Sequence, residues 1–267
     1  MKRYPLILFF VLAYLFSWIV WFGNLAQLRG LVGFHIPGAF AFIGLSLAAV
    51  IAALATAGMA GFRDLISRWV RWKVEPVWYG VAFFFTALLG LIAILIGAAV
   101  GLGAGIGKDA TAAAALGYFA FQLPLFLVTE ESAWRGFALP RLQLQYSALT
   151  SSLILGLLWG LWHMPLFLTP ETFQSQLPFV GFLLSAVATS IMHTWLFNNT
   201  RGSVLLAAIF HAATDASILY LGVMTGGGVH FWIFVMVQWI AVAVIIWRTG
   251  AQHLTRKTDL RGTSYTA

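Results

Sequence analysis

The sequence predicts an all-α, polytopic membrane protein with about eight transmembrane helices, and its composition is the first observation that does so. Only 9% of the 267 residues are charged, whereas 61% are hydrophobic, and the mean hydropathy is +0.91. Soluble domains carry about 25% charged residues, and disordered chains combine low hydrophobicity with high charge. The composition therefore excludes both classes. Because the chain has no cysteine, disulfides and cysteine-based zinc sites are excluded as well.

The second observation is a series of apolar segments, each long enough to cross a hydrocarbon core that requires about 20 helical residues. The predicted spans are residues 5–28, 36–59, 77–104, 112–139, 148–168, 177–197, 203–222 and 229–247. No long linker separates them, so we predict one integral membrane domain over residues 1–267. Within it we distinguish three N-terminal helices (1–110), a core (111–222) and a last helix with a basic tail (223–267).

The boundaries of these spans follow from turn-forming residues. The third span begins after Pro76, the fourth ends before Pro140, and the sixth begins beside Pro178. Proline is tolerated at such ends because its missing backbone N–H costs least there. The glycine-rich segment 225–228 separates the last two spans. The fourth span differs from the others because charged residues interrupt it.

The third observation is the distribution of basic residues. If the N-terminus is cytoplasmic and the spans alternate, then all of the 15 Lys and Arg residues except Arg29 and Lys108 lie in cytoplasmic segments. The positive-inside rule predicts this asymmetry. We therefore expect both termini in the cytoplasm of a bacterial or archaeal cell, with the protein in the cytoplasmic membrane. The net charge of +7 is then a topology signal, and we expect no nucleic-acid partner.

A few ionisable residues lie inside the apolar spans, where a charge costs about 2.5–3.5 kcal/mol even on insertion scales. Such residues are candidates for a functional site by default. They are concentrated in the fourth to seventh spans: Glu130, Glu131, Arg135, His163, His193, His211 and Asp215. We interpret His193 as an interhelical hydrogen-bonding residue and assign the others to a site on helices 4, 5 and 7.

Helical spacing relates the acidic and basic residues of the fourth span. Glu131 and Arg135 are four residues apart, so they can pair on one helix face and offset each other's burial. Glu130 lies about 100° around the helix from Glu131. It can therefore point into the bundle without sharing that arginine.

The other two spans show the same spacing. His211 and Asp215 are four residues apart, so Asp215 could orient the imidazole, or both could bind one ligand. Trp159 lies one turn before His163 and could wall the same site. Depth along the helices places Glu130 and His211 near mid-membrane and His163 further towards the outer side. Convergence would need helix tilt or a kink at Pro165.

These residue types allow two chemistries. Glu130, helped by His163, could act as a general base on a water that attacks a carbonyl, while His211 stabilises the oxyanion. Alternatively, Glu130, His163, His211 and Asp215 could hold a divalent metal such as Zn²⁺, whose bound water is the nucleophile. The helix-borne zinc signature HExxH is absent. The sequence leaves both chemistries open.

The spans carry three ordered motifs, Glu130-Glu131-x-x-x-Arg135, Trp159-x-x-x-His163 and His211-x-x-x-Asp215. In these the sequence resembles the CPBP intramembrane proteases, which include type II CAAX prenyl endopeptidases and bacteriocin-immunity (Abi) proteins. The family motifs are Glu-Glu-x-x-x-Arg, aromatic-x-x-x-His and His-x-x-x-Asn/Asp on successive core helices. The resemblance covers about residues 121–219.

This resemblance implies an eight-helix fold with a membrane-embedded cavity open towards the cytoplasm, and residues 111–222 as its catalytic core. It implies peptide-bond hydrolysis in which Glu130 and His163 activate water and His211 with Asp215 forms the oxyanion site. The implied supporting residues are Glu131, Arg135 and Trp159. Trp159 replaces the commoner Phe, which we expect to matter little. Asp215 replaces the Asn of prenyl proteases, and an ionised Asp would repel an oxyanion.

The expected partners are membrane lipids and a peptide or lipidated-peptide substrate, either prenylated and CAAX-type or a bacteriocin or leader peptide. The sequence does not indicate the oligomeric state. One alternative is a non-catalytic immunity or scaffold protein on the same fold. Another is an ion-coupled transporter, which the crowding of polar residues into one half disfavours because transporters often carry inverted repeats.

Overall fold

The computed structural model describes residues 4–103 and 111–255, and every regular element in these ranges is helical. The α-helices are α1 (Tyr4–Leu28), α2 (Ala39–Ser67), α3 (Pro76–Ala99), α4 (Ala112–Val128), α5 (Leu139–Gln143), α6 (Ala148–Trp162), α7 (Met164–Phe167), α8 (Phe179–Asn199), α9 (Val204–Leu221) and α10 (Val229–Thr249). Several basic residues used to predict the topology lie outside the described residues: Lys2, Arg3, Lys108, Arg256, Lys257 and Arg261.

The all-α polytopic membrane fold is confirmed. In the described ranges, seven helical segments are long and apolar enough to cross a membrane. The remaining predicted span, 148–168, corresponds to α6, which has only 15 residues. It ends early because His163 leaves the helix and Pro165 follows in the short α7. The chain is therefore a multi-pass integral membrane protein whose fifth predicted span, α6, is short.

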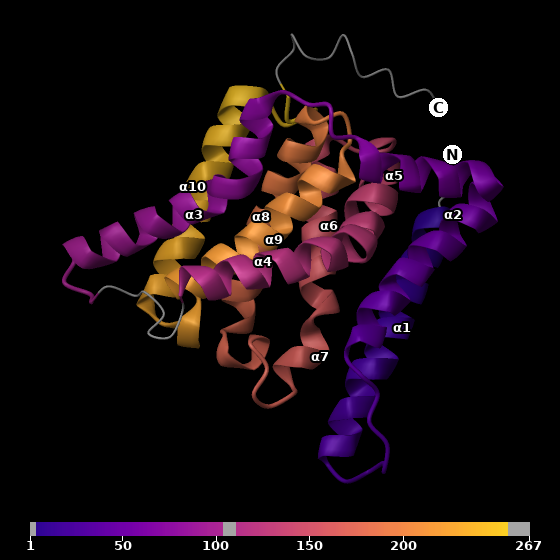
Figure 1. The fold of residues 1–267 in the computed structure, drawn as a ribbon, viewed down its shortest axis with the longest axis horizontal. Helices are drawn as coiled ribbons and strands as arrows, with labels where there is room; N and C mark the ends of the chain where they lie inside the picture. Colours follow the sequence, from indigo (N-terminus) through magenta and orange to yellow (C-terminus); the bar gives the residue numbers. More distant parts are fainter. Residues whose placement is uncertain (1–3, 104–110, 256–267) are drawn as a thin grey trace.

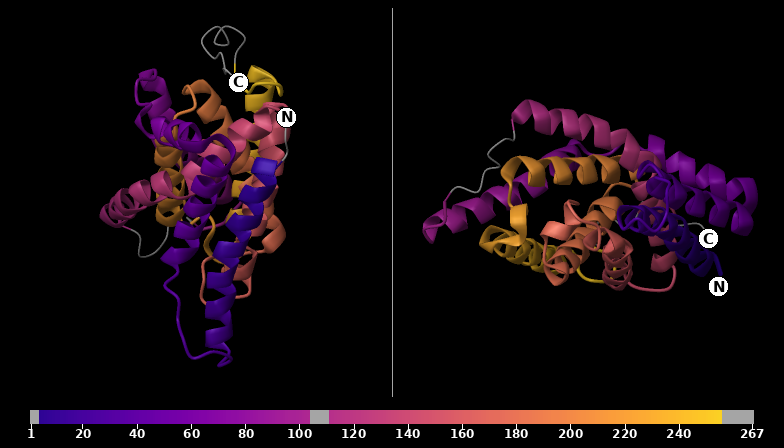
Figure 2. Two further views of the ribbon diagram at one scale, coloured as in Figure 1. Left: turned by 90° about the vertical axis from the view of Figure 1, so that its right-hand side faces the viewer. Right: turned by 90° about the horizontal axis from the view of Figure 1, so that it is seen from below.

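The helices form a bundle with two distinct sides. Helices α1 and α2 pack together as a long hairpin that extends beyond the other helices at one end (Figures 1 and 2). Helices α3 and α10 lie on the opposite side (Figure 1). Between them, α6 packs against α8, while α9 is flanked by α3 and α4. The sixth and seventh predicted spans, α8 and α9, thus form the centre of the bundle, whereas most residues of α4 are exposed.

Small residues bring α6 and α8 into close contact. Gly156 and Gly160 share a face of α6, as in the small-x-x-x-small pattern of membrane helices. A Cβ atom added at Gly156 would lie 2.8 Å from Cα of Val187, and one at Gly160 would lie 2.5 Å from Leu183. Gly156 therefore requires glycine, because the close atom belongs to the backbone, whereas a Cβ at Gly160 would require the Leu183 side chain to move. This packing holds the end of α6, which carries Trp159 and His163, against the helix that carries His193.

Helix α1 satisfies backbone groups at the end of α6. The Tyr14 hydroxyl donates to the carbonyl of Leu158 at 2.5 Å, and the Trp18 indole N–H donates to the carbonyl of Trp162 at 2.9 Å. A helix that ends inside a bilayer must find partners for its last carbonyls, because hydrocarbon offers none. The aromatic side chains of α1 thus allow α6 to end within the bundle.

Candidate functional site

The glutamate pair lies where the regular α-helix of α4 breaks. The backbone at Thr129 leaves the helical region, with φ −109° and ψ −95°. A π-helical segment, Ser132–Ala138, follows, and all of its residues are buried. Its first residue is fixed by two hydrogen bonds of 2.6 Å, in which Trp69 Nε1 donates to Ser132 Oγ and Ser132 Oγ donates to the Leu127 carbonyl. Short π-helical segments are rare and frequent at functional sites.

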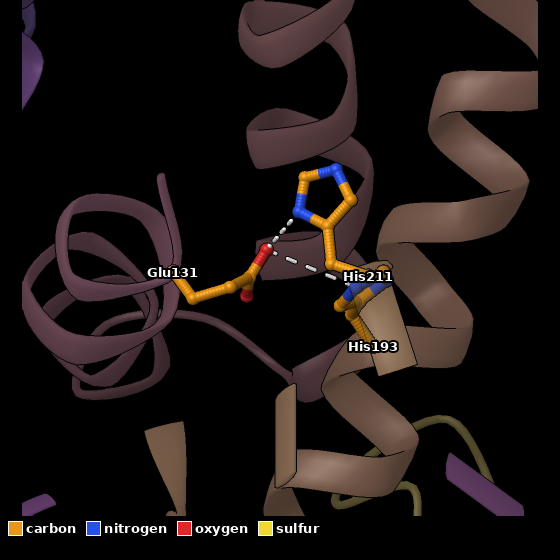
Figure 3. Close-up of side chains that lie close together, drawn as sticks. All are labelled: Glu131, His193 and His211. Atoms are coloured by element: carbon orange, nitrogen blue, oxygen red, sulfur yellow. Dashed lines mark hydrogen bonds and ion pairs between the residues drawn. The ribbon is translucent and has the colours of Figure 1, made fainter. Parts of the chain in front are cut away.

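Glu131 connects three helical segments (Figure 3). Its Oε1 atom accepts a hydrogen bond from Arg135 Nη1 at 2.8 Å and lies 2.7 Å from His211 Nδ1 and 3.8 Å from His193 Nε2. The carboxylate and the guanidinium are both fully enclosed. The ion pair expected from the four-residue spacing therefore forms. Through its contact with His211, Glu131 also holds α9 to the end of the fourth span.

His211 is oriented by its surroundings. Its ring stacks on Phe126, with centroids 3.7 Å apart and planes 9° apart. The Trp159 ring is nearly perpendicular to it, with the two centroids 5.4 Å apart. With Glu131 ionised and accepting at Nδ1, the proton on that nitrogen is fixed. Nε2 is left to face a substrate or a solvent molecule.

His193 also lies in this cluster, although the sequence interpretation placed it outside the site. It was taken as an interhelical hydrogen-bonding residue, and its Nδ1 does contact the Thr189 carbonyl at 2.9 Å within its own helix. Its Nε2, however, is fully buried, has no hydrogen-bond partner among the described residues, and faces Glu131. Its ring also lies 5.5 Å from that of His211. No local spacing could have revealed this, because Glu131 is on another helix.

Glu130 has a different set of neighbours. Its Oε2 atom accepts a hydrogen bond from Trp159 Nε1 at 2.7 Å and a longer one from Trp134 Nε1 at 3.3 Å. In the described parts of the chain, its other carboxylate oxygen receives no hydrogen bond. The side chain is only 2% exposed. Trp134 was not among the predicted site residues, although it lies four residues after Glu130, a spacing that could have indicated the contact.

His163 is the residue at which α6 ends. Its Nδ1 lies 2.9 Å from the Trp159 carbonyl, and its ring is enclosed by Trp162, Phe182 and Trp21. Within the described residues, no hydrogen bond or ion pair joins it to Glu130, His211 or Asp215. Trp159 connects the two sides instead, because its indole donates to Glu130 while its carbonyl contacts His163. A Phe at this position could not connect the two residues in this way, because it has no indole N–H to donate to Glu130.

Asp215 lies one turn beyond His211 on α9 and is half-buried. In the part of the chain that the structure describes, its carboxylate makes no hydrogen bond or ion pair. It is thus placed near His211 by the helix alone and remains free to interact with a ligand.

The arrangement also tests whether a metal ion fits. Among the described residues, one group has suitable ligand atoms within 4.8 Å of one another, and it consists of Glu131, His193 and His211. Of the four metal ligands considered from the sequence, only His211 is in this group. A cation between these three would have to share the Glu131 carboxylate with the Arg135 guanidinium, whose Nη1 already donates to Oε1 at 2.8 Å. Two cations that share one buried carboxylate oxygen repel each other, so the group as arranged does not fit a resident metal.

Comparison with known proteins identifies the same segment of the chain. Residues 111–217 match the family described as type II CAAX prenyl endopeptidase Rce1-like. The chain is also 36% identical over 97 residues to CAAX prenyl protease 2 of Methanococcus maripaludis, which is 34% of this chain and 36% of that protein. The aligned part thus spans about a third of that relative. The resemblance to the CPBP family is confirmed over this segment, which contains all three motifs.

Proposed function

We propose that this protein is an intramembrane endopeptidase that hydrolyses a peptide bond of a membrane-associated substrate. The observation that carries the proposal is the position of Glu130 within the matched segment. It is a buried carboxylate in which one oxygen is held by an indole N–H and the other is left for a water molecule. A buried carboxylate costs too much in a membrane protein to serve packing alone.

The first chemical step assigns Glu130 the role of general base. Its free oxygen takes a proton from water, and the water oxygen attacks the scissile carbonyl carbon. The bond from oxygen to carbon forms as the carbonyl π bond opens, which leaves a tetrahedral intermediate with a negative oxygen. Glu130 then returns the proton to the amide nitrogen, the C–N bond breaks, and a carboxylic acid and an amine are released. The acid then loses its proton to the amine, which gives a carboxylate and an ammonium group.

His211 is suited to stabilise that oxyanion. Because Glu131 accepts at Nδ1, the opposite nitrogen of the ring is directed away from the ion pair. As an imidazolium, this ring donates from Nε2 to the developing negative charge, a contribution that typically accounts for a hundredfold or more in rate for each donor. Asp215, one turn further on, completes the oxyanion site when it carries a proton and donates. His163 assists Glu130 through Trp159, to which both are bound.

Glu131 and Arg135 are proposed to position these groups. The Arg135–Glu131–His211 chain fixes the ring orientation, as the carboxylate of a catalytic triad fixes its histidine. Arg135 also lies 5.1 Å from the centroid of the Trp159 ring, so it contacts the residue that holds Glu130. The ion pair therefore supports both halves of the site.

The substrate class follows from where the site lies and from the comparison. The catalytic side chains lie on helices that cross the membrane, so the scissile bond must be near the bilayer. We propose a peptide held at the membrane by a lipid anchor or an apolar segment, with a prenylated CAAX-type peptide as the first candidate because the Methanococcus relative is a CAAX prenyl protease. A bacteriocin or leader peptide is the second candidate.

The test uses the full-length protein in liposomes and an internally quenched peptide, in farnesylated and unfarnesylated forms. We expect wild-type protein to cleave and Glu130→Gln to be reduced about 10²–10⁴-fold, the usual contribution of a general base. Glu171→Gln is the matched control, because Glu171 is exposed and outside the site. If Glu130→Gln remained as active as the control, the assigned mechanism would be wrong, and retention of a cellular phenotype without cleavage would favour the scaffold alternative.

A further inference from the structure

A second concave site lies on the side of the bundle opposite the α1–α2 hairpin. It is a cleft of about 960 Å³ between α3, the end of α8 and α10. None of the residues assigned to hydrolysis lines it. It is therefore separate from the glutamate and histidine cluster, although Trp195, two residues after His193, forms part of its wall.

The walls of the cleft are apolar along most of a membrane span. On α3 the lining runs from Val77 to Ile96, which is about 28 Å at 1.5 Å per residue. This length is close to the hydrocarbon thickness of a bilayer, about 30 Å. On α10 the lining includes Val237, Ile240 and Val244. Apolar side chains that line a cleft lack packing partners on the side that faces it. A hydrocarbon chain would supply those contacts at this depth of the bilayer.

One end of the cleft is polar and charged. Arg201, Arg248 and Glu75 line it, at the end of α8, the end of α10 and the start of α3, and all three are exposed. Arg201 is held in the left-handed region, with φ 56°, a conformation that costs free energy in a non-glycine residue. Its carbonyl accepts a hydrogen bond of 2.9 Å from Arg71 Nη1, which fixes the loop.

A buried arginine lies behind this mouth. Arg68 is 7% exposed and is paired with Asp64 at 3.1 Å, while its Nη1 atom has no hydrogen-bond partner among the described residues. A Cβ atom added at Gly202, next to Arg201, would lie 2.9 Å from that nitrogen. Arg68 thus packs against the loop that presents Arg201, and the exposed Arg201 and Arg248 make the mouth attractive to an anion.

We propose that this cleft binds one membrane glycerophospholipid, with an acyl chain along α3 and α10 and the headgroup phosphate at Arg201 and Arg248. Two arginines suit the phosphodiester, and Glu75 suits an ammonium group beside it. The headgroup of phosphatidylethanolamine has both charges. The lipid fills a gap between α3 and α10 that the protein leaves open, so it acts as a structural part of the bundle.

The experiment measures phosphatidylethanolamine retained by the full-length protein in detergent, by native mass spectrometry, before and after titration with added lipid. We expect wild-type protein to keep one lipid. Arg201→Gln with Arg248→Gln should lower the bound fraction at least about tenfold, since each basic residue near a phosphate contributes about 1 kcal/mol. Ala241→Trp, which fills the cleft wall, should do the same. The matched controls are Arg63→Gln and Ala55→Trp, both exposed on α2.

Several outcomes would overturn the proposal. Equal lipid retention in the two cleft variants and the two controls would show only non-specific annular lipid. Displacement of the bound lipid by a farnesylated peptide at equal concentration would make the cleft a substrate site. A third arm tests the headgroup: Glu75→Gln should weaken phosphatidylethanolamine relative to phosphatidylglycerol. An unchanged ratio would contradict the ammonium assignment, and unchanged retention in Ala241→Trp alone would contradict the acyl-chain contact.

Discussion

Glu130 and Glu131 are consecutive residues, yet the structure places their carboxylates in different surroundings. Glu131 is bound by a guanidinium and an imidazole, and both are held in place by packing. Glu130 is bound by the N–H groups of two tryptophans, neither of which carries a charge. Both residues follow the break at Thr129, and consecutive side chains on a helix are directed about 100° apart, so the two carboxylates meet different neighbours.

The comparison separates a structural carboxylate from a reactive one. A buried carboxylate whose counterion is close by stays ionised, since protonating it would leave the arginine unpaired. A buried carboxylate bound only by neutral donors has no such counterion and can exchange a proton with water. The two sites are coupled through Trp159, which donates to Glu130 and lies beneath the Arg135 guanidinium.

Replacing each glutamate separately by glutamine should give the largest difference between the two residues. We expect Glu130→Gln to fold normally and to lose activity about 10²–10⁴-fold. We expect Glu131→Gln to be destabilised by about 3–5 kcal/mol, because Arg135 is then buried without a counterion. Thermal unfolding in detergent and peptide hydrolysis in liposomes distinguish the two effects. Equal loss of stability in both variants would contradict the division of roles.

The ion-pair part of this prediction has its own controls. Glu131→Gln combined with Arg135→Met removes the unpaired charge and should recover much of the lost stability. Asp64→Asn removes the partner of Arg68 in a pair whose carboxylate is 46% exposed. Because solvent reaches one side of this pair, that change should cost less than Glu131→Gln.

Asp215 tests the oxyanion side of the comparison. Asp215→Ala removes a group that we assign to the oxyanion, and we expect hydrolysis to fall about 10²–10³-fold. Asp215→Asn restores a neutral donor and should stay within about threefold of wild type, since an amide donates without needing a proton. The ratio of these two rates is the measurement. An Asn variant as inactive as the Ala variant would show that Asp215 acts as a carboxylate.

Trp159→Phe sharpens the comparison at the contact between the two carboxylates. The change keeps the aromatic ring beside His163 and His211 but removes the N–H that donates to Glu130. A hydrogen bond to a charged group contributes about 1.5–3 kcal/mol, so we expect hydrolysis to fall about 10- to 100-fold, with a smaller change in unfolding temperature than in Glu131→Gln. Trp232→Phe, at an exposed tryptophan of α10 outside the site, should leave the rate close to that of wild type.

The smallest expected effect concerns His193 and a metal. Because the Glu131, His193 and His211 group does not fit a metal beside Arg135, His193→Gln should change hydrolysis less than about threefold. Purified active protein should contain no stoichiometric zinc, and a chelator should not inhibit it. Elemental analysis of wild type and variant tests this. Zinc that is present in wild type and lost in His193→Gln would establish a metalloprotease instead.

Local patterns were sufficient for part of the site. The i, i+4 spacing of Glu131 and Arg135 predicted an ion pair that forms, because residues so spaced are neighbours on any helix. Hydropathy predicted the helical membrane fold for the same reason, since a bilayer accepts few other backbones. The extent of the fifth span, 148–168, was overestimated, because hydropathy does not register that the helix ends at His163.

The sequence by itself determined that this is a multi-pass membrane protein with costly ionisable residues in four spans, and which of them share a helix face. Only the tertiary structure decided which helices those residues join. Glu131 meets His211 across 80 positions of chain and Glu130 meets Trp159 across 29, contacts that no periodicity encodes. They depend on how closely α6 and α8 approach at Gly156 and on the break at Thr129, which are set by side-chain packing between helices.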